Sequence, residues 1–244
     1  MSLTLTSLGG AGTVTGSRHL LEYKGQRLLI DCGLFQGYKA LRERNWAAFP
    51  IDPKSIDAIV LTHAHIDHSG YLPKLVREGY RGPVYCSSAT KDLCEILLRD
   101  SAYINERDAE RANRYRYTKH KHAEPLYTVA DAELALKQLA PIDFHQDVHL
   151  AIGADIHLRR AGHILGASTV EVRWGGKTIV FSGDLGRYGD PFMFDPEPVT
   201  AADYVVVEST YGNRTHPKID PMEQLGEVID RTVKRGGTVI IPSF

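Results

Sequence analysis

Cysteine is scarce in this sequence, and no stretch of it stays apolar for long. The 244 residues include three cysteines, none of them in a CxxC pair, which argues against a disulfide framework and against a cysteine-ligated zinc ribbon. We expect all three to be small buried apolar side chains. No apolar run approaches the roughly 20 residues of a membrane span, so no membrane partner is expected.

The chain also lacks a targeting signal and an excess of charge of one sign. The opening stretch MSLTLTSLGG has no basic segment followed by an apolar one, so we expect a cytoplasmic protein. The net charge of -1 excludes a surface that is basic as a whole, and any contact with nucleic acid must be local. A hydrophobic content of 43% can fill the core of one large α/β domain, or of one domain and part of another.

Apolar periodicity predicts short strands and helices along the chain. Strands are expected at residues 4–8, 19–33 with a turn at Lys24-Gly25, 57–62, 82–87, 148–162, 168–184 with a turn at Gly175-Gly176, and 202–210. Helices are expected at 69–80 with Ser69 as the cap, at 88–117, and at 128–139 with Thr128 as the cap. The apolar stretch GGTVIIPSF, residues 236–244, is predicted to be a further strand.

The stretch LTHAHIDHSG, residues 61–70, places three histidines and an aspartate within six positions after a buried strand. In an extended loop alternate side chains point the same way, so His63 and His65 can converge on one metal ion. Asp67 and His68, at the start of the next helix, can serve a second ion. Imidazole and carboxylate without thiolate favour zinc over iron or manganese. The alternative is a polar loop whose histidines only face water.

A two-metal site needs further ligands, and three downstream or upstream positions offer them. His163 lies in AGHILGAS, Asp184 lies in FSGDLG, and Asp31 ends RLLIDCG. His163 follows a predicted strand, and Asp31 and Asp184 each end one. His163 and Asp184 also stand in glycine-flanked loops, where the backbone can approach an ion closely. Each alone is also typical of an ordinary turn. Their joint occurrence with the histidine cluster favours the metal-site interpretation.

Four motifs in this order, LIDCG, HAHIDH, GHILGA and SGDLG, resemble the leading motifs of the metallo-β-lactamase fold hydrolases. A fifth, VVVESTYGNRTH, resembles the opening motif of the β-CASP branch, which includes the endonuclease subunit of the cleavage and polyadenylation specificity factor and its prokaryotic ribonuclease relatives. The resemblance implies an α/β protein whose residues 1–207 form most of a four-layered αββα sandwich. It implies that residues 208–244 are only the beginning of a β-CASP lid domain.

The resemblance also implies roles for individual residues. His63, His65 and His163 would hold one of two zinc ions, Asp67 and His68 the other, and Asp184 would bridge them. Asp31 would lie behind the ligands and orient an imidazole or the bridging water. The catalytic residues would be Asp67, Asp184 and Glu208, the last supporting a histidine that protonates the leaving oxygen. The alternative for Glu208 is a solvated carboxylate at the end of a strand.

The function implied by the resemblance is a zinc-dependent phosphodiester hydrolase that cleaves RNA by attack of a metal-activated hydroxide. Two further family motifs, each with a histidine, would lie beyond Phe244, so residues 1–244 alone are expected to bind metal weakly and to cleave poorly. The alternatives are a hydrolase of DNA, of a thioester or lactam, or of a small ester on the same fold, and a non-catalytic RNA-binding scaffold. Whether the protein is a homodimer or a subunit of an RNA-processing complex stays open.

Residues 111–122, RANRYRYTKHKH, combine basic and aromatic side chains and contain no acid. Phosphate contact together with base stacking suits single-stranded RNA. The candidate RNA contacts are Arg111, Arg114, Tyr115, Arg116, Lys119 and Lys121. The alternative is a solvated helix end, because runs of charge usually face water. The glycine-rich GGAGTVTGS near the start lacks the Gly-Lys-Ser/Thr of a phosphate loop and is predicted to be a tight loop near the metal site.

Overall fold

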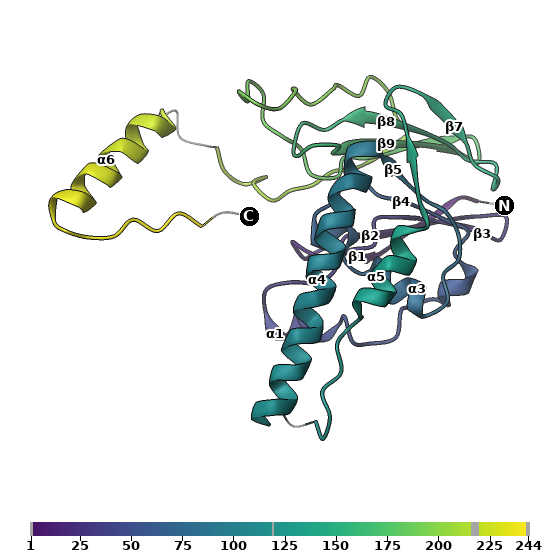
Figure 1. The fold of residues 1–244 in the computed structure, drawn as a ribbon. Coiled ribbons are helices and arrows are strands. Elements are labelled where there is room, and N and C mark those ends of the chain that lie inside the picture. The colour runs from purple at the N-terminus through teal and green to yellow at the C-terminus, as the bar shows by residue number, and fades with distance from the viewer. Residues whose placement is uncertain (1, 119, 216–219, 243–244) are drawn as a thin grey trace. The chain divides into compact units, whose positions relative to one another are not determined.

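Two β-sheets and a layer of helices form the larger part of the chain (Figure 1). The structure is a computed structural model that describes residues 2–118, 120–215 and 220–242. The chain divides into two compact units, Met1–Glu208 and Ser209–Phe244. Each unit is described by itself below.

The first sheet has six strands in the order β1-β2-β3-β4-β5-β6. Their bounds are Thr4–Gly9, Arg18–Tyr23, Gln26–Ile30, Ala58–Val60, Val84–Ser87 and Leu139–Ile142. The strands β1, β2 and β3 pair antiparallel, and from β3 to β6 the pairing is parallel. The parallel strands therefore end at one edge of the sheet, where the chain enters its loops.

The second sheet has five strands in the order β11-β10-β9-β8-β7. Their bounds are Tyr204–Val206, Lys177–Phe181, Ser168–Trp174, Asp155–Arg160 and Asp147–His149. All neighbours pair antiparallel except β10 and β11, which run parallel. This sheet is built almost entirely from the second half of the larger unit.

Among the helices of the larger unit, α3, α4 and α5 pack on the first sheet. The bounds of this unit's helices are Lys39–Glu43 (α1), Ile66–Ser69 (α2), Leu72–Arg77 (α3), Ser88–Tyr115 (α4) and Val129–Leu136 (α5), with a short 3-10 turn at Pro53–Ser55. One apolar core joins side chains of α3, α4 and α5 to one face of the first sheet. The other core lies between the two sheets. The period-two alternation of a strand explains this division: Leu29 faces the helices, while Leu28 and Ile30 face the second sheet.

These layers confirm the predicted mixed α/β class. The described residues of the larger unit form three layers of the expected αββα order, helix, sheet and sheet, since every helix that contributes to a core packs on the first sheet. In the part of the chain that the structure describes, no helix is both long and apolar enough to cross a membrane. The three cysteines are unpaired and buried, as expected.

Several local predictions are confirmed. The hairpin turns use two left-handed residues each, Lys24 and Gly25 with φ of 53° and 81°, and Gly175 and Gly176 with φ of 59° and 74°. Thr128 caps α5 through a reciprocal capping box with the side chain of Asp131.

Two local predictions are wrong. Ser69 is not a cap but the last residue of α2, and its hydroxyl donates to the carbonyl of Ala64 at 2.8 Å. The predicted strand at 236–244 is absent from its described part, residues 236–242. A strand needs a partner, and the described residues of the second unit form only one helix, α6 (Pro221–Lys234), and no strand. The exposed apolar side chains Met222, Leu225 and Val228 of α6 recur at every third residue, a spacing typical of one face of a helix.

The segment after β3 holds the histidine-rich helix α2 in place. The backbone N–H of Cys32 donates to the carbonyl of His68 at 2.7 Å, and the N–H of Leu34 donates to that of Ile66 at 2.9 Å. From the glycine-rich loop, the N–H of Ser17 donates to the carbonyl of Asp67 at 2.9 Å. Gly33 lies so close that a Cβ on it would overlap the Asp67 carbonyl group.

Gly33→Ala is therefore expected to push α2 away from β3. Because the neighbour is backbone, the clash cannot be relieved by a side-chain rotation, and we expect a loss of about 1–3 kcal/mol in unfolding free energy together with weaker metal binding. Tryptophan fluorescence during denaturant unfolding measures this, since both tryptophans, Trp46 and Trp174, lie in the larger unit. Gly226→Ala, where a Cβ meets nothing within 4 Å, is the control. Unchanged stability and metal affinity of Gly33→Ala would show that this close approach is unimportant.

Candidate metal centre

Loops that follow neighbouring strands bring the predicted ligands together. His63 and His65 follow β4, His163 lies between β8 and β9, and Asp184 follows β10. The two sheets meet at this edge, because the backbone N–H of Ser168 at the start of β9 donates to the carbonyl of Thr62 after β4 at 2.9 Å. Ligands far apart in sequence thus converge without a long loop.

Three imidazoles and one carboxylate form a single donor cluster. Nδ1 of His65 lies 3.1 Å from Nε2 of His63 and 3.1 Å from Nε2 of His163. Oδ2 of Asp184 lies 3.8 Å from Nε2 of His63 and 3.6 Å from that of His163. The four ligand atoms all lie within 4.8 Å of one another. Tetrahedral ligands at zinc-nitrogen bond lengths lie about 3.3 Å apart, so the spacing fits one metal ion.

A second donor set lies on the other side of Asp184. Nε2 of His68 is 3.3 Å from Oδ1 of Asp184 and 3.8 Å from Oδ2 of Asp67. The two oxygens of Asp184 thus face different sets, Oδ2 toward His63 and His163 and Oδ1 toward His68. A carboxylate in this position can join two metal ions.

The electrostatics of the cluster favour a bound cation. Burial and the neighbouring imidazoles hold the pKa of His63 well below its usual range, so its ring is neutral and keeps a lone pair for a metal. Burial also lowers the pKa of His65. Burial raises the pKa of Asp67, with Asp184 adding to it. For His68, burial opposes the charged ring, but Asp31 and Asp184 outweigh it and raise the pKa to about 10.

Asp31 lies beneath the cluster and is 1% exposed. Its carboxylate accepts hydrogen bonds from the backbone N–H of Thr62 at 2.8 Å and from the hydroxyl of Ser17 at 3.0 Å. It also lies 2.7 Å from Nδ1 of His68. A proton on that nitrogen donates to Asp31 and leaves Nε2 of His68 to face Asp184.

Thr62 and Ser17 are site residues that sequence reasoning missed. The hydroxyl of Thr62 lies 3.0 Å from both oxygens of Asp31 and 3.1 Å from Nδ1 of His63. It can accept from His63 and donate to Asp31, which turns Nε2 of His63 toward the centre. The position of Thr62, directly before the first histidine, was the available signal. Ser17 gave no signal beyond its place in the glycine-rich loop.

The remaining predicted site residues lie in two places. Oε1 of Glu208 accepts from the backbone N–H of Leu185 at 2.8 Å, and the N–H of Glu208 donates to the hydroxyl of Ser182 at 3.0 Å. Glu208 therefore contacts the loop that carries Asp184. Of the candidate RNA contacts, Arg111, Arg114 and Tyr115 lie in the last turns of α4, and Arg116 is its C-cap. Lys121 lies in the loop that follows, and Lys119 lies outside the described residues.

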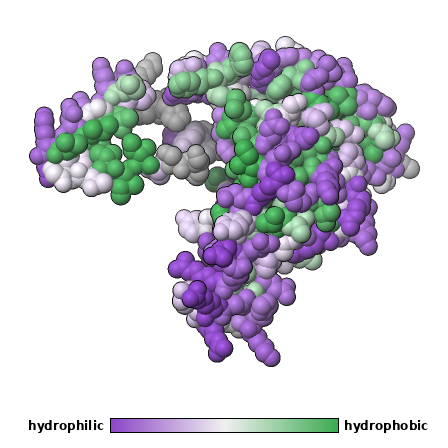
Figure 2. Space-filling model, viewed as in Figure 1, coloured by the Kyte–Doolittle hydropathy of each residue, from purple (hydrophilic) through white to green (hydrophobic). Residues whose placement is uncertain are grey.

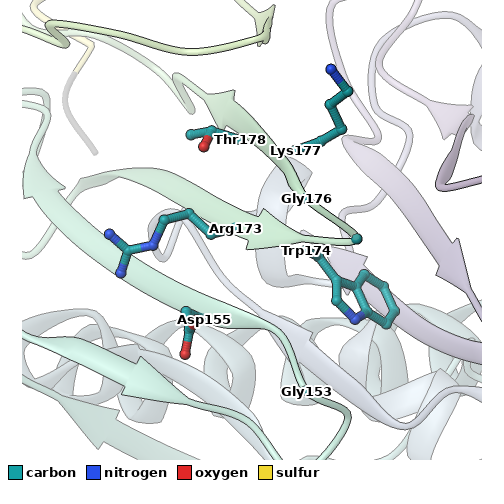
Figure 3. Close-up of a pocket in the computed structure, with 8 residues that line it drawn as sticks. Gly153, Asp155, Arg173, Trp174, Gly176, Lys177 and Thr178 are labelled. Carbon is teal, nitrogen blue, oxygen red and sulfur yellow. The ribbon is translucent and has the colours of Figure 1, made fainter.

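A pocket elsewhere on the second sheet is separate from this cluster. It is lined by Gly153, Asp155 and the residues from Arg173 to Thr178 (Figure 3). The pocket lies at the start of β10, whereas Asp184 follows its end. Its cations are already neutralised, Arg173 by Asp147 at 2.7 Å and Lys177 by Asp203 at 3.0 Å.

Asp31→Asn is expected to weaken metal binding ten- to a hundredfold, because a neutral amide makes His68 a poorer ligand and does not fix its ring. Competition with a chromophoric chelator measures the affinity. Asp147→Asn is the matched control, since Asp147 also lies 2.8 Å from Nδ1 of a histidine, His157, but outside the cluster. Equal affinities of the two variants, both folded, would contradict the role given to Asp31.

Comparison with known proteins places these features in a family. Residues 12–220 match the Metallo-beta-lactamase superfamily. The chain is 41% identical to "Ribonuclease TTHA0252" of Thermus thermophilus over 99% of its own length and 52% of the relative. It is 33% identical to "Transcription termination factor FttA" of Methanosarcina mazei, covering 98% of this chain and 37% of that protein. It is 31% identical to "Endoribonuclease YSH1" of Saccharomyces cerevisiae, and the match covers 98% of this chain and 30% of that protein.

The chain thus spans about half the length of the first of these relatives and about a third of the other two. Two of the three are named as ribonucleases, which confirms the predicted resemblance to RNA-processing nucleases. The match covers all four leading motifs. On this match and on the arrangement of its strands and helices, the chain belongs to the metallo-β-lactamase superfamily.

Proposed function

We propose that the protein is a zinc-dependent phosphodiester hydrolase that acts on RNA. The observation that carries the proposal is the placement of Asp184 between two donor sets, with one carboxylate oxygen toward each. Such a site suits a substrate whose charge must be neutralised on two sides, as in a phosphodiester. The names of the relatives support RNA as the polymer.

Zinc is the favoured metal because the donors are imidazoles and carboxylates at tetrahedral spacing. The three cysteines are buried, and none of them belongs to the cluster of candidate ligands among the described residues. In the proposed pair of sites, His63, His65 and His163 hold one ion and Asp67 and His68 the other. Two bound zinc ions supply acidification of a water and neutralisation of phosphate charge.

Three residues behind the ligands hold the ligand side chains in their orientations. Asp31 holds the proton on Nδ1 of His68, and Thr62 holds the corresponding nitrogen of His63. Glu208 fixes the backbone of Leu185, which follows Asp184 directly, and so limits the rotation of the Asp184 loop. In the proposal, Glu208 also supports the group that protonates the leaving oxygen.

We propose further that residues 1–207 are the metallo-β-lactamase domain and that residues 208–244 begin a β-CASP lid domain. The resemblance of VVVESTYGNRTH and the shares of the relatives that the chain covers support this division. Residues of a longer chain would complete the second metal site and supply the general acid. Residues 1–244 alone would then bind metal weakly and cleave poorly.

Cleavage assays with a panel of substrates test the function. We expect the zinc-loaded full-length protein to cleave RNA, and Asp184→Asn to lose at least a hundredfold in rate, since it removes charge stabilisation from both metal positions. Asp155→Asn, an exposed carboxylate paired with His149 at 2.8 Å, is the matched control. Cleavage of DNA or of small esters but not of RNA would indicate another hydrolase, and RNA binding without cleavage would indicate a scaffold.

Glu208→Gln distinguishes a catalytic role from a solvated carboxylate. The amide oxygen can still accept from Leu185, so we expect metal content and KM to stay near those of the parent. The loss of charge next to the reacting groups is expected to lower kcat by about a hundredfold or more. An unchanged kcat over the whole pH range would leave Glu208 without a part in the reaction.

A further inference from the structure

The far end of α4 carries a cluster of basic and aromatic side chains, here named the α4 tip and defined as Arg111, Arg114, Tyr115, Arg116 and Lys121. All five are exposed. The sequence from 111 to 122 contains no aspartate or glutamate. In Figure 2 the lower end of the molecule, where α4 ends in Figure 1, is strongly hydrophilic. The metal site leaves this cluster unexplained.

The α4 tip is built on a closed loop. The side chain of Asn113 donates to the carbonyl of Ala123 at 2.9 Å, and the N–H of Ala123 donates back to Asn113 at 2.7 Å. Arg116 adopts the left-handed conformation that ends the helix, with φ of 52°. Just beyond the loop, Leu126 and Tyr127 are buried in the core against α4. Arg111, Arg114 and Tyr115 thus project from the last turns of a regular helix, which reduces the entropy cost of binding.

The arginines of the α4 tip differ from the other arginines of α4. Arg99 is paired with Glu133 at 2.6 Å, and Arg107 is paired with Glu110 at 2.8 Å. Among the residues that the structure describes, no carboxylate forms an ion pair with Arg111, Arg114 or Arg116. These charges are therefore available to an anionic partner at little desolvation cost.

The exposed aromatic side chains indicate which kind of anionic partner the α4 tip binds. Tyr115 is 63% exposed and Tyr117 is 62% exposed, although a tyrosine ring normally buries much of its surface. The guanidinium of Arg114 lies over the ring of Tyr115, 5.5 Å from its centroid. Exposed rings next to arginines can stack unpaired bases while the arginines contact phosphates. An acidic protein would use the charges but has no comparable use for two exposed rings.

The α4 tip lies far from the metal centre. The first turn of α4 is attached to the loop of His163, because the hydroxyls of Ser87 and Thr90 donate to the carbonyl of Gly166 at 2.7 and 3.0 Å. The helix then runs for 28 residues, which at 1.5 Å per residue is about 40 Å. No residue of the α4 tip can therefore reach the phosphate that is cleaved.

From these observations we propose that the α4 tip is a remote anchor for single-stranded RNA, and the proposal rests on the RNA-cleaving function proposed above. A strand that occupies the metal centre and the α4 tip together must span about 40 Å, or about 12 nucleotides at 3.4 Å per stacked step. The anchor strengthens the binding of long RNA and leaves short RNA unaffected. It selects substrates by length, independently of the chemistry at the metal ions.

The test compares RNA of two lengths on the zinc-loaded full-length protein. Arg111→Gln, Arg114→Gln and Lys121→Gln are combined in one variant, which leaves the helix-ending Arg116 in place. The control variant combines Arg99→Gln, Arg107→Gln and Lys177→Gln, which removes the same charge from ion-paired positions. For single strands each phosphate contact contributes about 0.7 to the slope of log K against log salt. We expect the first variant to flatten that slope by about 2 for a 30-nucleotide RNA and not for a 4-nucleotide one, which cannot span the distance even when fully extended.

Each other outcome has a distinct meaning. If long RNA is cleaved and the first variant binds it with the parent's salt slope, the anchor is overturned while the nuclease function stands. If the first variant loses the same affinity for both RNA lengths, the three charges act through the overall charge of the protein, and the anchor proposal is again contradicted. If a poly-glutamate peptide of equal charge displaces long RNA from the parent, the α4 tip is a protein-docking surface instead. If the parent neither binds nor cleaves RNA, the proposed function itself fails.

Discussion

The buried carboxylate of Asp31 is the interaction on which the site depends. An ionised carboxylate at 1% exposure is tolerated only when donors surround it, and here they come from three separate segments. Ser17 belongs to the glycine-rich loop, Thr62 follows β4, and His68 lies on α2. Asp31 itself has φ of 61°, a left-handed conformation that aspartate tolerates better than most residues. One side chain thus joins the ends of two strands to the helix that carries two of the six predicted ligands, Asp67 and His68.

The position of Asp31 also determines close backbone contacts around the site. Because Asp31 holds His68, the following residues Cys32 and Gly33 must run against α2, and only a residue without a Cβ fits beside Asp67. A similar contact recurs at the other half of the site, where a Cβ on Gly186 would overlap the carbonyl of Gly162. The glycines around the ligands therefore serve packing between loops as much as the binding of an ion. Sequence reasoning had assigned them only to the ion.

The parts that the sequence predicted are those governed by local spacing. His63, His65, Asp67 and His68 stand on one short segment, so their approach follows from the chain itself, and Lys24-Gly25 and Thr128 follow from known turn and cap preferences. His163 and Asp184 approach these residues only because the two sheets pack together. Local spacing does not predict that packing, and only the family resemblance did. The strand β6 escaped prediction because Leu139–Ile142 contains Pro141, which usually weakens a strand assignment. Thr62 escaped because its hydroxyl acts only through Asp31 and His63, which are brought together by the fold.

The net charge of -1 is compatible with the proposed RNA substrate, because the two requirements of such an enzyme would be spatially separate. In the proposed reaction, bound metal would supply the positive charge at the phosphate, while the protein's own carboxylates at the site lower its net charge. Away from the metal, affinity for the polymer needs only a few unpaired cations on a helix. The electrostatic part of the binding free energy depends on the number of phosphate contacts and not on the net charge of the domain. In the proposal, the long helix α4 would meet that need, because it carries Arg111, Arg114 and Arg116 away from the acidic centre, where the carboxylates of Asp67 and Asp184 would no longer repel an RNA strand.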